Sequence, residues 1–321
     1  MSYRALVTAN PVIRSQRARQ LLTDAGIAIT TLSIPEAANK AKQIEAVRNV
    51  DAYLAGVEYI TAEVMDAAPK LKVIARAGVG FESVDLDAAC KRNIAVTNTP
   101  GANHHTVADY VFGLMLELAR HIRVGQRTVK EGRWDRTLGI ELRGKTLGIV
   151  GFGRIGKEVA LRARGFHMNI ITYDVYQDTK FAAENGVRFV SIEELLRTSD
   201  FVSLNCNVTD QNRGMINRDT IALMKPTAYL MNTARGPLIN EDDLYEALKA
   251  GKIAGAGLDV LTKEPNPDTP LATLDNVVVT PHNAGSTVEA FEQMAVDATQ
   301  YVLDILSGKR VAACVNPEIW E

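Results

Sequence analysis

Short runs rich in β-branched residues alternate along the chain with longer segments whose apolar positions recur with a helical period. Up to residue 98, strands are predicted at 4–9, 27–32, 52–56, 72–78 and 94–98, and helices at 15–26, 35–48, 61–68 and 84–92. Parallel strands need crossover connections, and the helices that provide them cover both faces of a sheet. The alternation therefore predicts a parallel sheet covered by helices.

A second series of strands and helices follows the Pro100-Gly101 turn. It opens with one long helix predicted at about 104–130, which Gly132 ends. Further strands are predicted at 146–150, 168–173, 187–190, 200–204, 228–232, 254–260 and 277–280, and helices at 155–165, 191–197 and 240–250. This series predicts a second doubly wound parallel sheet, so the fold class is α/β. An amphipathic stretch at 286–307 lies beyond its last strand.

Length and composition agree with two globular domains. The chain has 321 residues, 46% of them hydrophobic and 23% charged, and domains typically hold roughly 100–200 residues. The formal net charge of -2 lacks the basic excess of a nucleic-acid-binding protein, so no nucleic-acid partner is expected. No segment predicts a signal peptide or a membrane span, which favours a cytoplasmic protein without a membrane partner. Cys90, Cys206 and Cys314 lack metal or redox spacing, so we expect reduced thiols.

The strand at 146–150 runs directly into a glycine-rich turn and then into a helix. Gly151, Gly153 and Gly156 form a GxGxxG pattern, which allows a tight turn, close approach of a pyrophosphate and close helix packing. Asp174 ends the next strand, at the spacing of about 20 residues expected for the acid that binds an adenosine ribose. The alternative is a plain tight turn followed by a capping aspartate. The combination favours a dinucleotide site.

Asp174 also indicates which dinucleotide binds. Its carboxylate would repel a 2′-phosphate, and the following Val175 and Tyr176 supply no compensating cation. The sequence therefore predicts NAD as the cofactor rather than NADP.

Three chemically capable side chains follow the carboxyl ends of predicted strands, where doubly wound sheets bind ligands. They are Arg235, Glu264 and His282. An imidazole that titrates near neutrality suits proton transfer, a carboxylate can orient it, and a guanidinium can bind a carboxylate. Each also has a structural interpretation: a capping ion pair, a loop acid and a buried histidine. The grouping favours a catalytic set.

Five motifs in order resemble the D-isomer-specific 2-hydroxyacid dehydrogenase family, which includes D-lactate, glyoxylate/hydroxypyruvate and phosphoglycerate dehydrogenases. They lie at 75–85, 98–109, 142–156, 231–244 and in the TPHNAG run at 280–285. The resemblance implies an NAD-dependent oxidoreductase that interconverts a small (R)-2-hydroxy acid and its 2-keto acid by hydride transfer. A scaffold that senses NAD(H), as corepressors on this fold do, is an alternative of another class.

The resemblance also assigns roles to residues. It implies that Arg235, Glu264 and His282 are catalytic, and that the substrate is bound by Arg76, Val79, Gly80 and Arg235. Backbone N–H groups of the loop at 77–80 would receive the substrate carboxylate. The implied cofactor contacts are Gly151, Gly153, Arg154, Ile155, Gly156, Asp174, Thr209, Thr233, Asp259 and Gly285.

The family organisation implies that the second sheet is inserted into the first domain. Residues 1–99 and 286–321 would form a flavodoxin-like substrate domain, and residues 100–285 a Rossmann-type dinucleotide-binding domain. The resemblance further implies a homodimer formed through the dinucleotide domain and the arm around Trp134.

The sequence does not decide whether the substrate is an unphosphorylated or a phosphorylated acid. Phosphoglycerate-specific members carry an Arg-Ser pair where this chain has Ala55-Gly56, which places a phosphate site in doubt, whereas Arg76 and Arg136 resemble cations used near such substrates. D-3-Phosphoglycerate dehydrogenase is therefore the alternative activity. Adjacent His104 and His105 suggest a metal, but neighbouring side chains are expected on different faces, so no metal site is predicted.

Overall fold

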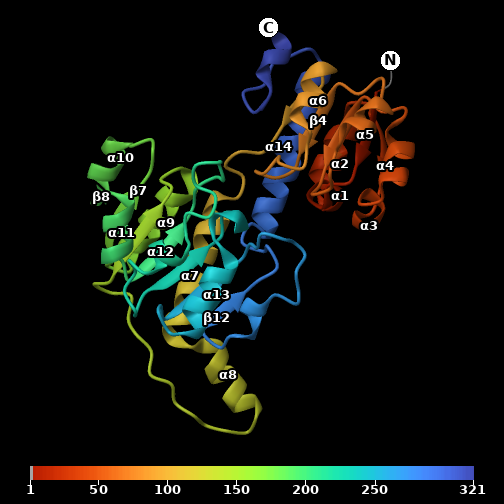
Figure 1. Ribbon diagram of the computed structural model, residues 1–321. Coiled ribbons are helices and arrows are strands. Elements are labelled where there is room, and N and C mark those ends of the chain that lie inside the picture. Colours follow the sequence, from red (N-terminus) through yellow and green to blue (C-terminus); the bar gives the residue numbers. More distant parts are fainter. Residues whose placement is uncertain (1–2) are drawn as a thin grey trace. The chain divides into compact units, whose positions relative to one another are not determined.

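The computed structural model describes residues 3–321. The chain divides into two compact units. One runs to Asn103 and resumes over Ser286–Glu321, and the other comprises His104–Gly285. Figure 1 labels some of the elements of each unit. Among the described residues, no helix has the length and apolar character that a membrane crossing requires.

The first unit contains a parallel sheet with the strand order β2-β1-β3-β4-β5. Its strands are β1 (Arg4–Val7), β2 (Ala28–Thr31), β3 (Ala52–Ala55), β4 (Val73–Arg76) and β5 (Ala95–Thr97). Strands β3, β4 and β5 are buried throughout, as expected where helices cover both faces. All strands are parallel, and their sequence order across the sheet reverses between β1 and β3, as in flavodoxin-like folds. This matches the predicted fold class.

Helices surround this sheet. They are α1 (Asn10–Arg14), α2 (Gln16–Asp24), α3 (Ile34–Ala37), α4 (Lys40–Val47), α5 (Ala62–Asp66), α6 (Leu86–Lys91) and α14 (Val288–Leu306), with the 3₁₀ helix η3 (Pro317–Trp320) near the end of the chain. The single helix predicted at 35–48 is wrong: Asn39 leaves helical geometry and caps α4 by accepting hydrogen bonds from Ala41 and Lys42 N–H. Helix α1 was not predicted.

Helix α14 completes the core of the first unit, although it lies far from the strands in sequence. Its buried face carries Ala295, Ala298 and Val302, which belong to the same apolar cluster as Val7 and Leu54 of the sheet. Small side chains allow a helix to approach a sheet closely. The amphipathic stretch predicted at 286–307 is thus a structural part of the first unit.

The second unit contains a parallel sheet with the order β12-β11-β10-β9-β6-β7-β8. The strands are β6 (Thr146–Val150), β7 (Asn169–Tyr173), β8 (Val187–Phe189), β9 (Phe201–Leu204), β10 (Tyr229–Asn232), β11 (Gly255–Leu258) and β12 (Val277–Val279). The order reverses between β6 and β9, as in Rossmann sheets. The predicted pair of parallel α/β sheets is therefore confirmed.

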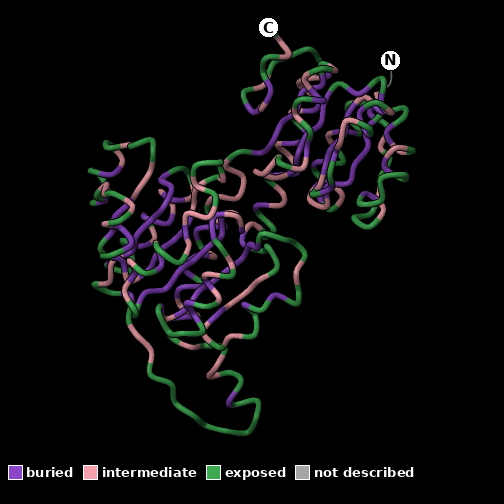
Figure 2. The backbone as a smooth tube through the Cα atoms, in the orientation of Figure 1, coloured by how far each residue is buried: buried purple, intermediate pink, exposed green. Residues whose placement is uncertain are grey.

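Its helices lie on both faces of the sheet and pack against two apolar clusters. Figure 2 colours the buried stretches of the backbone purple. They are α7 (His104–Arg120), α8 (Ile122–Lys130), α9 (Arg154–Gly165), α10 (Thr179–Glu184), α11 (Ile192–Thr198), α12 (Arg218–Ile221) and α13 (Glu241–Lys249), with 3₁₀ helices η1 (Gly236–Leu238) and η2 (Pro270–Thr273). The prediction of one continuous helix at 104–130 is wrong, because His121 adopts a left-handed conformation with φ 52° and separates α7 from α8.

Candidate active site

The glycine-rich turn connects β6 to α9 at the point where the strand order of the second sheet reverses. Gly151 has a φ of 94°, and a Cβ there would lie 2.7 Å from the carbonyl carbon of Asn205 in the loop after β9. A Cβ on Gly156 would lie 2.1 Å from the carbonyl oxygen of Gly151. Both glycines are therefore required by the backbone itself, which brings α9 tightly against β6.

Gly153 differs from these two glycines because a Cβ there would meet no protein atom within 4 Å. It is the N-cap of α9 and provides no side-chain cap, and Arg154 and Ile155 begin the helix. The helix therefore presents uncapped N–H groups and the positive end of its dipole beside open space. This arrangement fits a pyrophosphate group.

Asp174 follows β7 and lies next to the same turn. Its Oδ2 accepts a hydrogen bond from Phe152 N–H at 2.5 Å, and its Oδ1 accepts one from Tyr176 N–H at 2.9 Å. Val175 and Tyr176 are exposed, and neither carries a positive charge. The carboxylate is thus fixed beside the glycine turn, where it can accept hydrogen bonds from a ribose.

Two buried polar atoms near this end of the sheet could hydrogen-bond a ligand. Thr233 Oγ1 and Asn205 Oδ1 find no hydrogen-bond partner among the described residues, and buried polar atoms are normally paired. Thr209 is exposed, with its N–H donating to Asn212 Oδ1 at 2.7 Å, and Gly285 is half-buried. The turn, the fixed acid and the two unsatisfied atoms together fit a dinucleotide.

His282 and Glu264 form a hydrogen-bonded pair. Nδ1 of His282 lies 2.7 Å from Oε2 of Glu264, whose Oε1 accepts a hydrogen bond from Leu261 N–H at 2.8 Å. His282 has a φ of 54°, and its side chain is 55% exposed. A backbone in this uncommon region is typical of functional sites.

The two partners shift each other's titration. The hydrogen bond that His282 donates to Glu264 raises the pKa of His282, and the partial burial of the imidazole opposes this only in part. Burial alone would raise the pKa of Glu264, but the hydrogen bonds from His282 and Leu261 N–H outweigh it and lower that pKa. The pair therefore favours an imidazolium beside a carboxylate.

Asp259 holds the loop that carries His282. The carboxylate is 1% exposed and accepts hydrogen bonds from Thr280 Oγ1 at 2.6 Å and from the N–H groups of Asn283 and Ala284, each at 2.8 Å. The N–H of His282 donates to the carbonyl oxygen of Asp259 at 2.9 Å. Asp259 thus holds the backbone of His282 and the residues on either side of it. Both of its carboxylate oxygens accept hydrogen bonds from this loop.

Arg235 follows β10 and lies close to the pair. A Cβ on the adjacent Gly236 would lie 2.0 Å from the carbonyl carbon of Leu261, so the two loops are in backbone contact. The guanidinium charge contributes to the lowered pKa of Glu264 and opposes the rise in the pKa of His282. The structure therefore brings Arg235, Glu264 and His282 together.

The loop at 77–80 follows β4 in the first unit. The carbonyl oxygens of Gly78, Val79 and Gly80 accept hydrogen bonds from Thr99 N–H, Asn98 Nδ2 and Arg76 Nε, respectively. Within residues 3–321, the N–H groups of these three residues donate none. A row of free N–H groups fits a carboxylate.

Arg76 supports this loop rather than extending from it. The residue is 8% exposed, and its guanidinium donates to the carbonyl oxygens of Gly80 at 3.1 Å and Ala55 at 3.2 Å. The first contact holds the carbonyl group of Gly80 inward, and the second connects Arg76 to the end of β3. Arg136, on the exposed segment after α8, lies among residues with no buried side chains.

His104 and His105 lie side by side, contrary to the expectation that they face apart. Their ring centroids are 4.0 Å apart, and Nδ1 of His105 lies 3.0 Å from Oε2 of Glu158. The same Oε2 accepts a hydrogen bond from Arg162 at 2.7 Å. Because the guanidinium already balances the carboxylate, we interpret this group as a surface ion-pair network.

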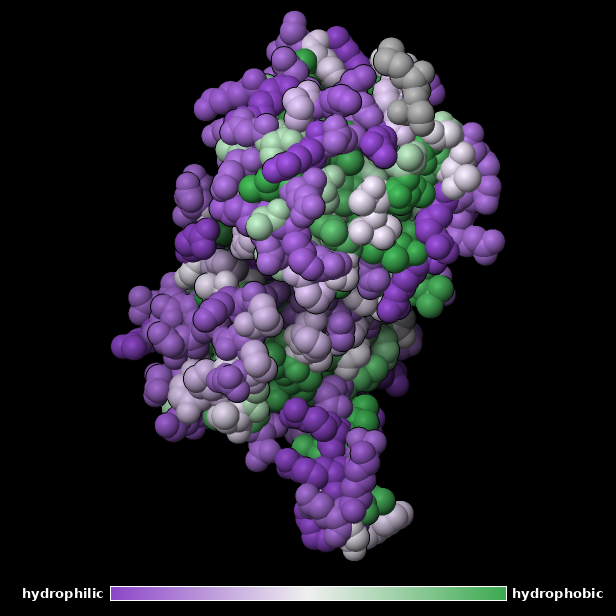
Figure 3. All heavy atoms as spheres, turned by 90° about the vertical axis from the view of Figure 1, so that its right-hand side faces the viewer, coloured by the Kyte–Doolittle hydropathy of each residue, from purple (hydrophilic) through white to green (hydrophobic). Residues whose placement is uncertain are grey.

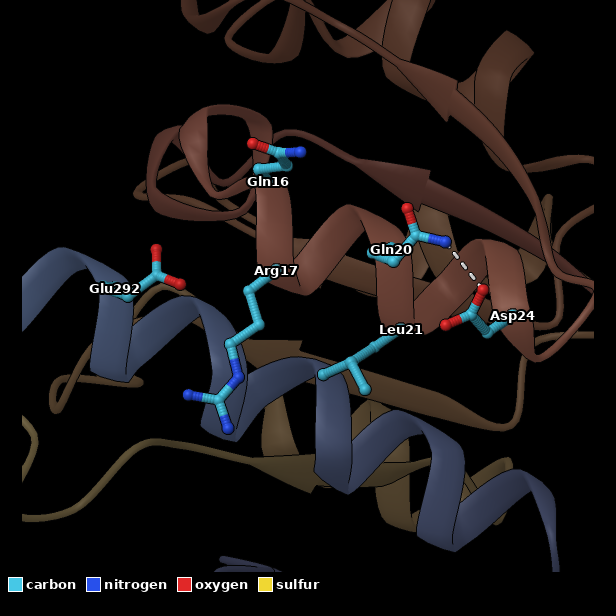
Figure 4. A pocket seen from close by; sticks show the side chains of 6 residues that line it. All are labelled: Gln16, Arg17, Gln20, Leu21, Asp24 and Glu292. Atoms are coloured by element: carbon cyan, nitrogen blue, oxygen red, sulfur yellow. Dashed lines mark hydrogen bonds between the residues drawn. The ribbon is translucent and has the colours of Figure 1, made fainter.

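A groove of about 470 Å³ lies between α2 and α14 (Figure 4). Its lining consists of Gln16, Arg17, Gln20, Leu21, Asp24 and Glu292. None of these residues belongs to the predicted site, and Gln20 and Asp24 hydrogen-bond each other at 2.7 Å. We assign this groove no role in the chemistry.

A family model agrees with the second unit. Residues 112–284 match the model described as D-isomer specific 2-hydroxyacid dehydrogenase, NAD binding domain. The match includes the glycine turn, Asp174, Arg235, Glu264 and His282.

Known proteins resemble a larger part of the chain. A glyoxylate reductase of Korarchaeum cryptofilum is 43% identical over 284 residues, which cover 86% of each chain. A D-3-phosphoglycerate dehydrogenase of Methanocaldococcus jannaschii is 46% identical over 260 residues, which cover 80% of this chain but only 50% of the relative. A solved structure from Thermus thermophilus is 37% identical, with a TM-score of 0.89 over 97% of this chain and 99% of that one.

Proposed function

The chain belongs to the D-isomer-specific 2-hydroxyacid dehydrogenase family, and from that premise we propose that it interconverts a small (R)-2-hydroxy acid and its 2-keto acid with NAD. The observation that carries this proposal is the 2.7 Å contact between His282 Nδ1 and Glu264 Oε2. An imidazole held in this way has its second nitrogen available for a substrate oxygen.

In the oxidation direction, His282 accepts the hydroxyl proton at Nε2. Glu264 holds Nδ1 and stabilises the imidazolium that forms. Arg235 binds the carboxylate and the oxygen on C2, because its planar fork of donors matches carboxylate geometry. In the reduction direction, the imidazolium returns the proton to the carbonyl oxygen.

NAD, when bound, supplies the hydride acceptor for oxidation and, when reduced, the hydride donor for reduction. We assign the pyrophosphate to the uncapped N-terminus of α9 at Gly153, and the adenosine ribose to Asp174. The unpaired Thr233 Oγ1 and Asn205 Oδ1 are further candidate contacts.

We assign substrate binding to the first unit and cofactor binding to the second. The free N–H groups at Gly78, Val79 and Gly80 receive the substrate carboxylate, and Arg76 keeps the loop in the required shape. The named relatives act on both unphosphorylated and phosphorylated acids, so the family alone leaves the substituent on C3 open.

A homodimer is part of the proposal. Helix α8 and the following segment extend away from the rest of the second unit (Figure 1) and carry apolar side chains among hydrophilic ones (Figure 3). Trp134 is 80% exposed and Leu138 95% exposed. Large apolar side chains on a projecting segment are typical of a protein interface, and a second copy of this chain is the expected partner.

The experiment is a panel of 2-keto acids with the purified protein and NADH. Pyruvate, glyoxylate, hydroxypyruvate, 2-ketoisocaproate and phosphohydroxypyruvate each report on a different substituent, and NADH oxidation is followed by absorbance. Turnover of at least one acid supports the proposal. Tight NADH binding without any turnover would favour the NAD(H)-sensing scaffold instead.

A further inference from the structure

The loops that follow β1 and β3 meet at the point where the strand order of the first sheet reverses. In open parallel α/β sheets, ligands bind beyond the carboxyl ends of the strands at this point. Thr8 follows β1, and Gly56 follows β3. The crevice between these loops is therefore the place where the first unit is expected to hold a ligand.

The carboxylate of Glu58 lies between these two loops. Glu58 is 9% exposed, and its Oε1 accepts hydrogen bonds from Tyr53 OH at 3.0 Å, from Gly56 N–H at 3.1 Å and from the hydroxyl of Thr8. Gln43 Nε2 donates to Tyr53 OH at 3.0 Å, so the phenol is oriented to donate to Glu58. Three donors, one after β1 and two from β3 and the residue that follows it, thus fix one carboxylate oxygen.

The backbone is shaped to accommodate this group. A Cβ on Gly56 would lie 2.8 Å from Oε2 of Glu58 and 3.3 Å from the carbonyl oxygen of Thr8, so a larger residue would displace the carboxylate. Val57 and Tyr59, which flank Glu58, are 73% and 76% exposed. The loop therefore turns its charged side chain inward and its apolar side chains outward, the reverse of the usual preference.

The second oxygen of Glu58 is available to a ligand. Within residues 3–321, Oε2 accepts no hydrogen bond, and it is not among the fully buried atoms without partners. No lysine or arginine in this range forms an ion pair with Glu58. The crevice thus offers an acceptor with negative charge, and the N–H of Gly56, which could otherwise bind an anion, is already used by Oε1.

We propose that Glu58 determines specificity at C3 of the substrate: it accepts a hydrogen bond from a C3 hydroxyl and repels a C3 phosphate. This inference rests on the proposed function and narrows its substrate class to unphosphorylated short-chain acids. The physical reason is that like charges brought together in a partly desolvated site are strongly disfavoured, whereas a hydroxyl donor satisfies the free oxygen.

The test compares Glu58→Gln with the wild type on glyoxylate, hydroxypyruvate and phosphohydroxypyruvate. Glutamine keeps the size of the side chain and an oxygen for the three donors but removes the charge. Glyoxylate has no C3 and serves as the internal reference. We expect kcat/KM for the phosphorylated acid, relative to glyoxylate, to rise by at least about tenfold in the variant.

Glu63→Gln is the matched control. Glu63 lies on α5 in the same unit, and its side chain is 61% exposed in an ion pair with Lys40, so its loss removes the same charge without reaching the crevice. The kcat/KM values for hydroxypyruvate and phosphohydroxypyruvate, each relative to glyoxylate, should both match the wild type in this variant. Thermal unfolding of both variants reports whether the fold is retained.

An unchanged phosphorylated-to-glyoxylate ratio in a folded Glu58→Gln variant would overturn the inference. The wild type gives an independent reading should the variant fail to fold: a kcat/KM for phosphohydroxypyruvate equal to or above that for hydroxypyruvate also overturns it. Failure of the proposed function looks different, because no acid in the panel would then be turned over by the wild type.

Discussion

Nδ1 of His282 lies 2.7 Å from Oε2 of Glu264, so one nitrogen of the imidazole is held by a carboxylate. Within the described part of the chain, Nε2 has no hydrogen-bond partner. The hydrogen bond raises the pKa of His282 and lowers that of Glu264. A proton carrier with this arrangement remains charged to a higher pH than a free histidine.

The first prediction concerns pH. Reduction of a keto acid needs the protonated imidazole, so kcat/KM falls as pH rises through the pKa of His282. Glu264→Gln removes the carboxylate charge that raises this pKa, and the descending limb of the profile should therefore move to lower pH. Steady-state profiles of both proteins check this, and coincident limbs would contradict it.

Two glycines of the same turn should respond differently to alanine. Gly156→Ala places a Cβ 2.1 Å from a backbone oxygen, and we expect a loss of about 1–3 kcal/mol in the free energy of unfolding. Gly153→Ala meets no protein atom, so its unfolding should match the wild type while its NADH affinity falls by about tenfold or more. Denaturant unfolding and fluorescence titration measure the two effects, and similar behaviour of both variants would refute the assignment.

Asp174 should determine the preference for NADH over NADPH. Asp174→Ala removes the acceptor for the ribose hydroxyls and the charge that repels a 2′-phosphate. The Kd for NADH should rise by about tenfold, and the Kd for NADPH should fall. Titration with both cofactors measures the ratio. A wild-type protein that binds NADPH as tightly as NADH would refute this role.

The arm after α8 should control the oligomeric state. Leu138→Arg places a charge at a side chain that is 95% exposed, and we expect a dimer to become a monomer. Ile34→Arg is the control, because Ile34 is 54% exposed on α3 of the first unit. Light scattering after size exclusion measures the mass. A wild-type monomer, or an unchanged dimer in Leu138→Arg, would contradict the proposal.

The sequence predicts those parts of the fold that depend on local pattern. The alternation of strands and helices identifies both sheets, and GxGxxG after a strand identifies the turn that Gly151 and Gly156 make necessary. Breaks set by single residues were missed: the left-handed His121 ends α7, and Asn39 caps α4. Neither position has a strong helix-breaking residue, so the helical period continued across it.

The candidate site shows the same division. Arg235, Glu264 and His282 follow strands whose carboxyl ends meet, so their convergence was predictable from topology. The support for His282 by Asp259 and the support of the 77–80 loop by Arg76 depend on side-chain direction, which spacing does not give. Glu58 had no signal at all. Its partner Thr8 is distant in sequence, and the spacing of Tyr53 and Gly56 does not show that they donate to the same carboxylate oxygen.

The most direct test of the account is the turnover of His282→Gln with NADH and the best keto acid of the panel. A positioned proton donor contributes roughly 10²–10⁴-fold to the rate, so kcat should fall by about that range. NADH affinity should stay within about twofold of the wild type, because the pyrophosphate and ribose contacts lie elsewhere. Wild-type turnover in this variant would contradict the assignment of His282 as the acid and base.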